Sequence, residues 1–137
     1  MKLICLALIG ICVMVSGCAT IKMSEKDTVI VLAKDVDKEK GPSNITDVFT
    51  FEGNIYAYTT FRWDIQNTSA GSYNIEVKWF NGDRQISTSQ QRVYFNQTPH
   101  YVWSKTRGTA MGTGKCRVEV YANDIFVGNK LFTVVEK

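Results

Sequence analysis

A hydrophobic pattern with a period of two runs through most of this chain, and it constrains the fold more than any other feature. In the stretch 73–79 an apolar or aromatic side chain occupies every odd position, and polar residues lie between. The stretches 55–63 and 116–121 alternate in a similar way. Successive side chains of a β-strand point to opposite faces of a sheet, so each stretch predicts a strand with one buried face. No stretch keeps an apolar period of 3.6 over three turns, so no helix is predicted.

Turn residues separate the predicted strands at short intervals. Asn81-Gly82 predicts a tight hairpin turn because these residue types adopt positive φ readily. The cluster 67–71, Pro99 and Asn123-Asp124 mark further breaks. Seven or eight short strands at this spacing predict an all-β protein, an antiparallel β-sandwich. We expect its inward aromatic side chains to be Phe61, Trp63, Tyr73, Trp79, Trp103 and Phe132.

The pattern is weaker in residues 28–42. The β-branched and aliphatic run 28–33 predicts a short edge strand. The segment 34–42 carries charges of both signs and ends in Gly-Pro, which favours an exposed loop.

The charges of two strands predict how they pair. If the strands 73–80 and 116–121 are antiparallel neighbours, the register that matches opposite charges places Lys78 opposite Glu119. A slip of two residues would instead set Lys78 against Arg117, which is a like-charge pair.

The N-terminus carries a separate signal. One cation, Lys2, precedes an unbroken apolar run over residues 3–15. A membrane-spanning helix needs about 20 apolar residues, so this shorter run behind a positive start is typical of an export signal. The run ends on Val15-Ser16-Gly17-Cys18. This motif resembles the lipobox of bacterial lipoproteins, and an ordinary secretory signal cut near Ala19 is the alternative.

The lipoprotein resemblance implies how the chain is processed and where it resides. It implies removal of residues 1–17 as a signal peptide and lipidation of Cys18, which anchors the protein to a membrane of the bacterial cell envelope. Two or more acyl chains make a lasting anchor. Since residue 19 is Ala rather than Asp, the family's sorting rule implies the outer membrane in a Gram-negative cell. We therefore expect a signal peptide at 1–17, a lipidated tether at 18–27 and a β-sandwich domain at 28–137.

The mature chain offers few clues to a ligand. Its net charge falls from +3 to +2 when Lys2 leaves, which is too weak to indicate nucleic acid as a partner. Cys116 is the one thiol left once Cys18 is lipidated, so a disulfide framework is excluded. One histidine, His100, with one thiol gives no zinc site, because catalytic zinc usually takes three protein ligands. We predict no metal, no cofactor and no catalytic residues.

The latter half of the chain, residues 73–135, carries a local resemblance. Its landmarks are Trp79, Asn81-Gly82, Trp103-Ser104, Gly114, Val118, Val120, Tyr121 and Phe132-Thr133-Val134. These residues resemble a family of exported bacterial sandwich domains of unknown function. The resemblance implies an Ig-like fold and no activity.

Outward aromatic side chains are the best candidates for binding. Tyr56 and Tyr58 lie two residues apart on one strand face, whereas the predicted register puts Phe80 and Tyr121 at opposite ends of another. Exposed aromatic rings stack on sugars or anchor protein partners. Two functions follow: an adaptor that binds an envelope protein through an edge strand or loop, and a module that binds carbohydrate or peptidoglycan through Tyr56 and Tyr58. A small envelope enzyme is the third and least favoured alternative.

Overall fold

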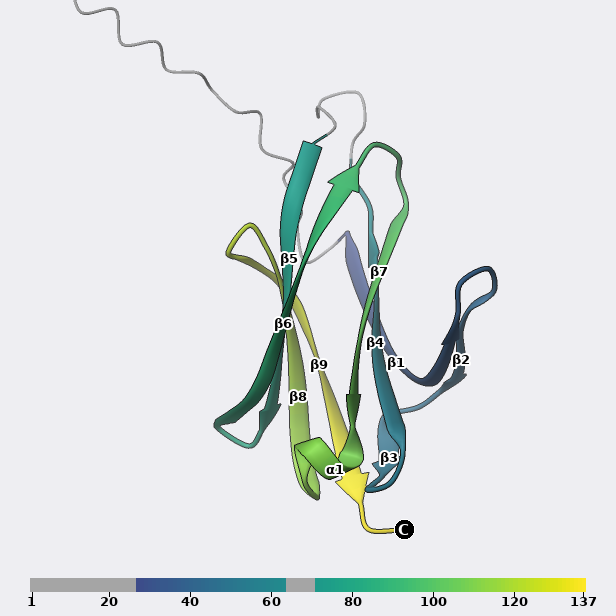
Figure 1. Cartoon of the computed structure of the whole chain (residues 1–137), viewed down its shortest axis with the longest axis vertical. Coiled ribbons are helices and arrows are strands. Elements are labelled where there is room, and N and C mark those ends of the chain that lie inside the picture. The colour runs from purple at the N-terminus through teal and green to yellow at the C-terminus, as the bar shows by residue number, and fades with distance from the viewer. Residues whose placement is uncertain (1–26, 64–70) are drawn as a thin grey trace, which may run out of the picture.

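The alternating sequence folds into two packed β-sheets, shown in Figure 1. The computed structural model describes residues 27–63 and 71–137. The four-stranded sheet has the order β2-β1-β4-β7 and contains β1 (Thr28–Asp37), β2 (Gly41–Ile45), β4 (Asn54–Phe61) and β7 (His100–Arg107). The five-stranded sheet has the order β3-β9-β8-β5-β6 and contains β3 (Val48–Thr50), β5 (Gly71–Asn81), β6 (Arg84–Phe95), β8 (Gly114–Ala122) and β9 (Ile125–Val135). The short helix α1 (Gly108–Met111) joins β7 to β8.

This architecture confirms the predicted all-β sandwich. The described residues form nine strands, because β2 and β3 are short strands in segments with no clear alternation. All strand pairs are antiparallel except β3 with β9, which run parallel. The predicted signal peptide, the tether up to residue 26 and the turn residues 67–70 lie outside the described residues.

The core lies between the two sheets and contains the predicted inward faces. Every odd residue of β5 from Tyr73 to Trp79 is buried, and Trp79 is only 1% exposed. Phe61 and Phe132 are buried as predicted, and Trp63 is half-buried against the core. Phe95 adds a buried ring outside the predicted inward set. Its ring contacts those of Phe61, Trp63, Tyr73 and His100.

Trp103 is a correction to the predicted core. Its side chain lies on the outer face of the four-stranded sheet, while Val102 and Ser104 point inward and are buried. The interior here needs small residues because β6 lies close to β7. The Ser104 and Ser89 hydroxyls are 2.8 Å apart across the two sheets. A Trp side chain would not fit between strands that approach this closely.

The segment 28–42 also differs from its prediction. β1 extends through ten residues and is therefore longer than the predicted strand 28–33; residues 28–32 have a strand partner only in β4 and so form an edge as predicted, while β2 pairs with residues 33–37. The expected loop 34–42 is instead a β-hairpin that projects from the sandwich (Figure 1). The Asp37 carboxylate accepts hydrogen bonds from the backbone N–H groups of Glu39 and Lys40, and Gly41 adopts φ +82°. Local turn chemistry therefore closes a hairpin although the charge pattern favours a loop.

The predicted register of β5 and β8 is confirmed. Lys78 lies opposite Glu119, and Val77 lies opposite Val120 on the buried face. The ion pairs, however, form along each strand, with Lys78 on Glu76 at 3.2 Å and Arg117 on Glu119 at 3.0 Å.

Candidate binding surface

The predicted pair Tyr56 and Tyr58 lies on the outer face of the four-stranded sheet. Tyr58 is opposite Trp103 on β7, and Tyr56 is opposite Lys105. Tyr56 and Tyr58 are both half-buried. Their outward placement follows from the strand alternation, since Ile55 and the other odd-numbered residues of β4 fill the core.

Tyr58 stacks with two aromatic neighbours. Its ring centroid is 5.6 Å from that of Tyr101 and 6.1 Å from that of Trp103, with interplanar angles of 27° and 13°. The hairpin residue Gly41 also approaches it, because a Cβ built there would lie 3.6 Å from the Tyr58 hydroxyl oxygen. Burial, and next the nearby Tyr101 hydroxyl, raise the pKa of Tyr58. Tyr58 is thus part of an aromatic cluster with Tyr101 and Trp103.

Tyr56 has a different neighbour. The Lys105 ammonium lies 5.4 Å from the centroid of its ring, a cation–π contact. Tyr56 and Tyr58 therefore have separate surroundings, and the aromatic cluster extends from Tyr58 toward β7. The sequence contains one signal for the outward position of this cluster. Residues 101, 103 and 105 share one face of a strand, and the lysine at position 105 indicates that this face is exposed.

A groove runs beside this cluster, between the edge strands of the two sheets. It has a volume of about 490 Å³ and is lined by Gln91, Arg92, Val93, Tyr94, His100, Tyr101, Val102 and Trp103. Tyr94 is 57% exposed and Tyr101 is 47% exposed. The groove therefore combines exposed aromatic surface with one guanidinium group.

Side chains of β6 fasten the two sheets together at this groove. The Gln91 amide donates a hydrogen bond of 3.2 Å to the backbone carbonyl of Trp103, close to the Ser89–Ser104 contact. Because the Gln91 amide occupies that carbonyl, it covers part of the β7 edge.

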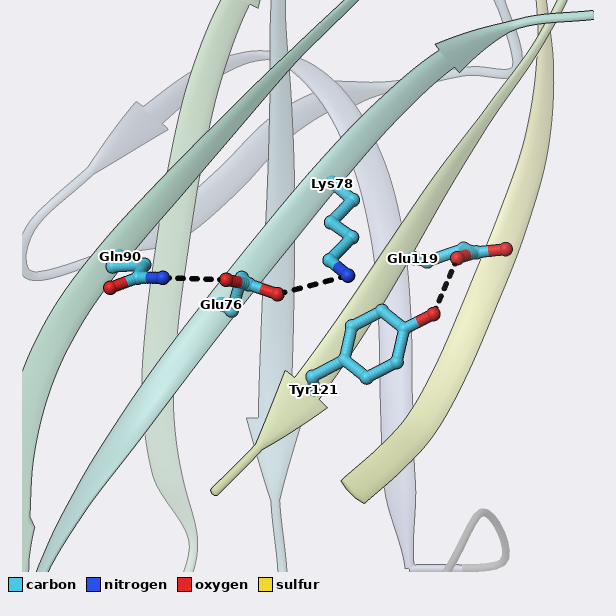
Figure 2. A network of polar contacts seen from close by, with 5 residues as sticks. All are labelled: Glu76, Lys78, Gln90, Glu119 and Tyr121. Atoms are coloured by element: carbon cyan, nitrogen blue, oxygen red, sulfur yellow. Dashed lines mark hydrogen bonds and ion pairs between the residues drawn. The ribbon is translucent and has the colours of Figure 1, made fainter. Parts of the chain in front are cut away.

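A polar network on the outer face of the five-stranded sheet joins β6 to β5, as Figure 2 shows. The Gln90 amide donates to Glu76 at 2.6 Å, and Glu76 also pairs with Lys78. The hydrogen bond from Gln90 is the main cause that lowers the pKa of Glu76. On β8 the Tyr121 hydroxyl donates to Glu119 at 2.7 Å, and this bond raises the pKa of Tyr121. β6 is therefore fixed by its neighbour β5 in a defined position.

Phe80 and Tyr121 lie at opposite ends of the β5–β8 pair on the outer face of the five-stranded sheet, as predicted. Phe80 is opposite Arg117, whereas Tyr121 is opposite Glu76. The Arg117 guanidinium lies 4.4 Å from the centroid of the Phe80 ring. The Lys78 ammonium similarly lies 4.5 Å from the centroid of the Tyr121 ring. Each ring is thus covered by a cation of the neighbouring strand.

A second hollow of about 440 Å³ lies on the five-stranded sheet, beside β3 and the β5–β6 turn. Its lining includes the exposed apolar residues Val48 and Leu131 and the carboxylates Asp47 and Asp83.

Cys116 and His100, the thiol and the histidine considered above for a zinc site, lie on different sheets. Cys116 is buried on β8, and burial raises the pKa of its thiol, which disfavours the reactive thiolate. His100 begins β7, and its ring packs edge-on to Phe95 with centroids 4.9 Å apart. Burial lowers the pKa of His100. Across the described chain, no three His, Cys, Asp or Glu side chains gather to hold a metal ion. Within residues 27–63 and 71–137, no helix has the length and apolar character needed to cross a membrane.

The fold belongs to the class of Ig-like β-sandwiches. The chain is similar to an immunoglobulin-like protein from Pseudomonas aeruginosa, with a TM-score of 0.51 and 8% identity over 78% of this chain and 92% of the other. It is also similar to part of a β-glucosidase from Listeria innocua, with a TM-score of 0.52 and 14% identity over 78% of this chain. The chain spans only 16% of that enzyme's length. No protein-family model matches the sequence, and no curated protein does either. At these identities the likeness concerns the fold alone.

Proposed function

We propose that this chain is a lipid-anchored, non-catalytic binding module of a bacterial cell envelope that engages a protein partner through the edge strand β6. One observation carries the proposal: β6 is a long edge strand that contains no proline, and its one β-bulge lies near its start, where Ser87 and Gln85 pair with Trp79 and Phe80. In the described structure it pairs with β5 along one side and has no strand along the other. Nine of its twelve residues are exposed. Unpaired N–H and C=O groups along such an edge are a template for pairing with another chain.

The strands at the other ends of the two sheets are all shorter than β6. β2 has five residues and contains Pro42, and β3 has three residues. β7 has Gln91 on one of its carbonyl groups. Short edges, proline and covering groups are common protections against edge pairing. β6 has twelve residues and no proline, so it is the edge best suited to receive a partner.

The sequence supports the anchor. The lipobox Val15-Ser16-Gly17-Cys18 precedes a tether of ten residues, 18–27, which spans at most about 33–36 Å when fully extended. β1 begins toward one end of the sandwich and the C-terminus lies toward the other (Figure 1). An anchor on Cys18 would therefore hold the start of β1 within about 33–36 Å of the membrane surface.

In-cell photo-cross-linking tests the binding role. A benzophenone amino acid replaces Thr88, an exposed residue in the middle of β6, in the full lipidated chain. The control carries the same group in place of Ser43, an exposed residue of the other edge strand β2. We expect a discrete protein adduct from position 88 and not from position 43. Equal adducts from both positions, or none from position 88, would contradict the proposal.

Labelling with radioactive palmitate tests the anchor. The Cys18→Ser precursor should stay unprocessed by the lipoprotein peptidase and unlabelled, while the wild-type chain takes up label. Label that persists in Cys18→Ser would show that the lipobox interpretation is wrong.

Carbohydrate binding is a second candidate, favoured by the aromatic cluster of Tyr58, Tyr101 and Trp103. Exposed rings on a rigid sheet suit stacking on sugars, and Tyr101 is 47% exposed. Co-sedimentation with purified peptidoglycan tests this function. It predicts that Tyr101→Ala weakens binding while Phe80→Ala, on the other sheet, leaves binding unchanged. The same co-sedimentation assay with Tyr56→Ala and Tyr58→Ala tests whether Tyr56 and Tyr58, the pair predicted from the sequence, contribute to binding.

A further inference from the structure

We infer that the β6 edge receives an extended, acidic segment of a protein partner, which adds to the five-stranded sheet as a further strand, with Arg92 as the group that recognises its carboxylate. This inference rests on the proposed function, because it names the chemistry of the partner at the same edge. Its support comes from the charges, the groove and the composition of β6.

Charge is segregated on the side of the sandwich that β6 and β7 form. The two strands carry Arg84, Arg92, Lys105 and Arg107 and contain no Asp or Glu. The whole chain, by contrast, has 13 acidic residues against 16 basic ones. Within the described residues Arg92 is exposed and forms no ion pair. An unpaired guanidinium beside an open edge is suited to a carboxylate, which it binds through two parallel hydrogen bonds.

The groove supplies side-chain specificity next to that charge. Arg92 and Tyr94 line it from β6, and Tyr101 lines it from β7. Arg and Tyr are enriched among the residues that carry most of the binding energy at protein interfaces. A partner strand beside β6 would place alternate side chains over this groove, while its backbone pairs with the edge.

The same charges disfavour a second copy of this chain as the occupant. Antiparallel pairing of β6 with β6 of another copy, centred on Thr88, would set Arg84 opposite Arg92 of the other copy twice, and β6 contains no acid to offset them. Like charges on facing strands are destabilising. The middle of the strand, residues 87–91, reads Ser-Thr-Ser-Gln-Gln, so it offers little apolar surface for non-specific association. An acidic partner avoids the repulsion and gains the charge pairing.

Peptide selection tests the inference. A phage library of random twelve-residue peptides is selected against the full lipidated chain held in nanodiscs. We expect enrichment of peptides that contain Asp or Glu among β-branched residues and that lack proline in their centre. Arg92→Gln should remove the acidic preference, and Arg92→Glu should replace it with a basic one. Lys38→Gln removes one exposed charge from the β1–β2 turn and should leave the preference unchanged.

Binding of one enriched peptide then measures the charge and locates the site. Replacing its acidic residue by the corresponding amide should weaken binding about two- to fivefold, as expected for a partly exposed ion pair. Arg92→Gln should abolish that difference. Hydrogen exchange should slow at backbone amides of β6 and not at those of β2.

Several results would overturn the inference. These are enrichment of neutral or basic peptides, no enrichment at all, binding of an acidic polysaccharide in place of any peptide, or protection away from β6. A protein adduct at position 88 together with any of them would leave the proposed function standing and refute only the acidic strand. Loss of that adduct would refute the proposed function itself.

Discussion

The two tryptophans Trp79 and Trp103 give the sharpest test of the sandwich, because the alternation pattern predicts both inward and the structure buries only one. Trp79 is 1% exposed and packs edge-on against Phe132, with ring centroids 6.0 Å apart. Trp103 is half-buried on the outer face and stacks on Tyr58. We therefore compare Trp79→Ala with Trp103→Ala.

The expected loss is larger for Trp79→Ala than for Trp103→Ala, by about two- to threefold at the middle of the two ranges. Trp→Ala in a core costs about 3–5 kcal/mol of unfolding free energy, because the cavity relaxes only partly. Trp103→Ala loses one aromatic pair, worth about 0.5–1.5 kcal/mol, and partial burial, so we expect about 1–2 kcal/mol in total. A domain of this size has about 5–15 kcal/mol of stability. At about 4 °C per kcal/mol, the melting temperature should fall by about 12–20 °C for Trp79→Ala and about 4–8 °C for Trp103→Ala.

Thermal and urea unfolding, followed by circular dichroism, measure both losses. Trp79→Phe keeps most of the buried volume and should recover much of the lost stability, which serves if the alanine variant does not fold. Iodide should quench Trp103 more than Trp79, since Trp103 is partly open to solvent and Trp79 is buried. Equal losses, or a larger loss for Trp103→Ala, would show that the faces of β7 are assigned the wrong way round.

Three further outcomes follow from single positions. Gly108→Ala should destabilise the domain by about 1–3 kcal/mol in urea unfolding, because its Cβ would lie 2.4 Å from the Thr50 carbonyl oxygen. Gly71→Ala, where the nearest atom is at 3.6 Å, is the matched control with little effect. Burial lowers the pKa of His100, so as the pH falls below about 6.5 the unfolded chain gains a proton that the folded chain does not. Unfolding free energy should therefore decline in that range, and a slope as steep in His100→Gln would contradict this origin. Cys116 should react slowly with an aromatic disulfide reagent at pH 8 and rapidly in urea, since burial raises the pKa of its thiol.

The sequence predicted strands where one face is apolar and the other polar. β5 shows this most clearly: its buried positions are the ones that the alternation marks, from Tyr73 to Trp79. Its register with β8 was also predictable, because only one alignment puts Lys78 opposite Glu119 rather than Arg117. The residues that share one face of a strand are a local property of the sequence, and the charges on that face restrict the registers that two strands can adopt.

The sequence was less informative about the ion pairs and the binding surface. The pairing of Lys78 with Glu76 depends on Gln90 and Tyr121, which come from two neighbouring strands. Tyr58 was predictable as an outward residue, but its contacts with Tyr101 and Trp103 depend on the pairing of β4 with β7.

The sequence by itself therefore determined the all-β class, the main strand faces, the β5–β8 register and the turn at Asn81-Gly82, where Gly82 adopts φ +57°. Only the tertiary structure decided which strands lie at the edges and which way β7 faces. β2 folds back onto residues 33–37 of β1 and leaves residues 28–32 paired with β4 alone, and β6 became an open edge because no described strand follows it in the sheet. The physical reason is that alternation records which side of a strand is buried, whereas an edge is defined by which other strand is absent.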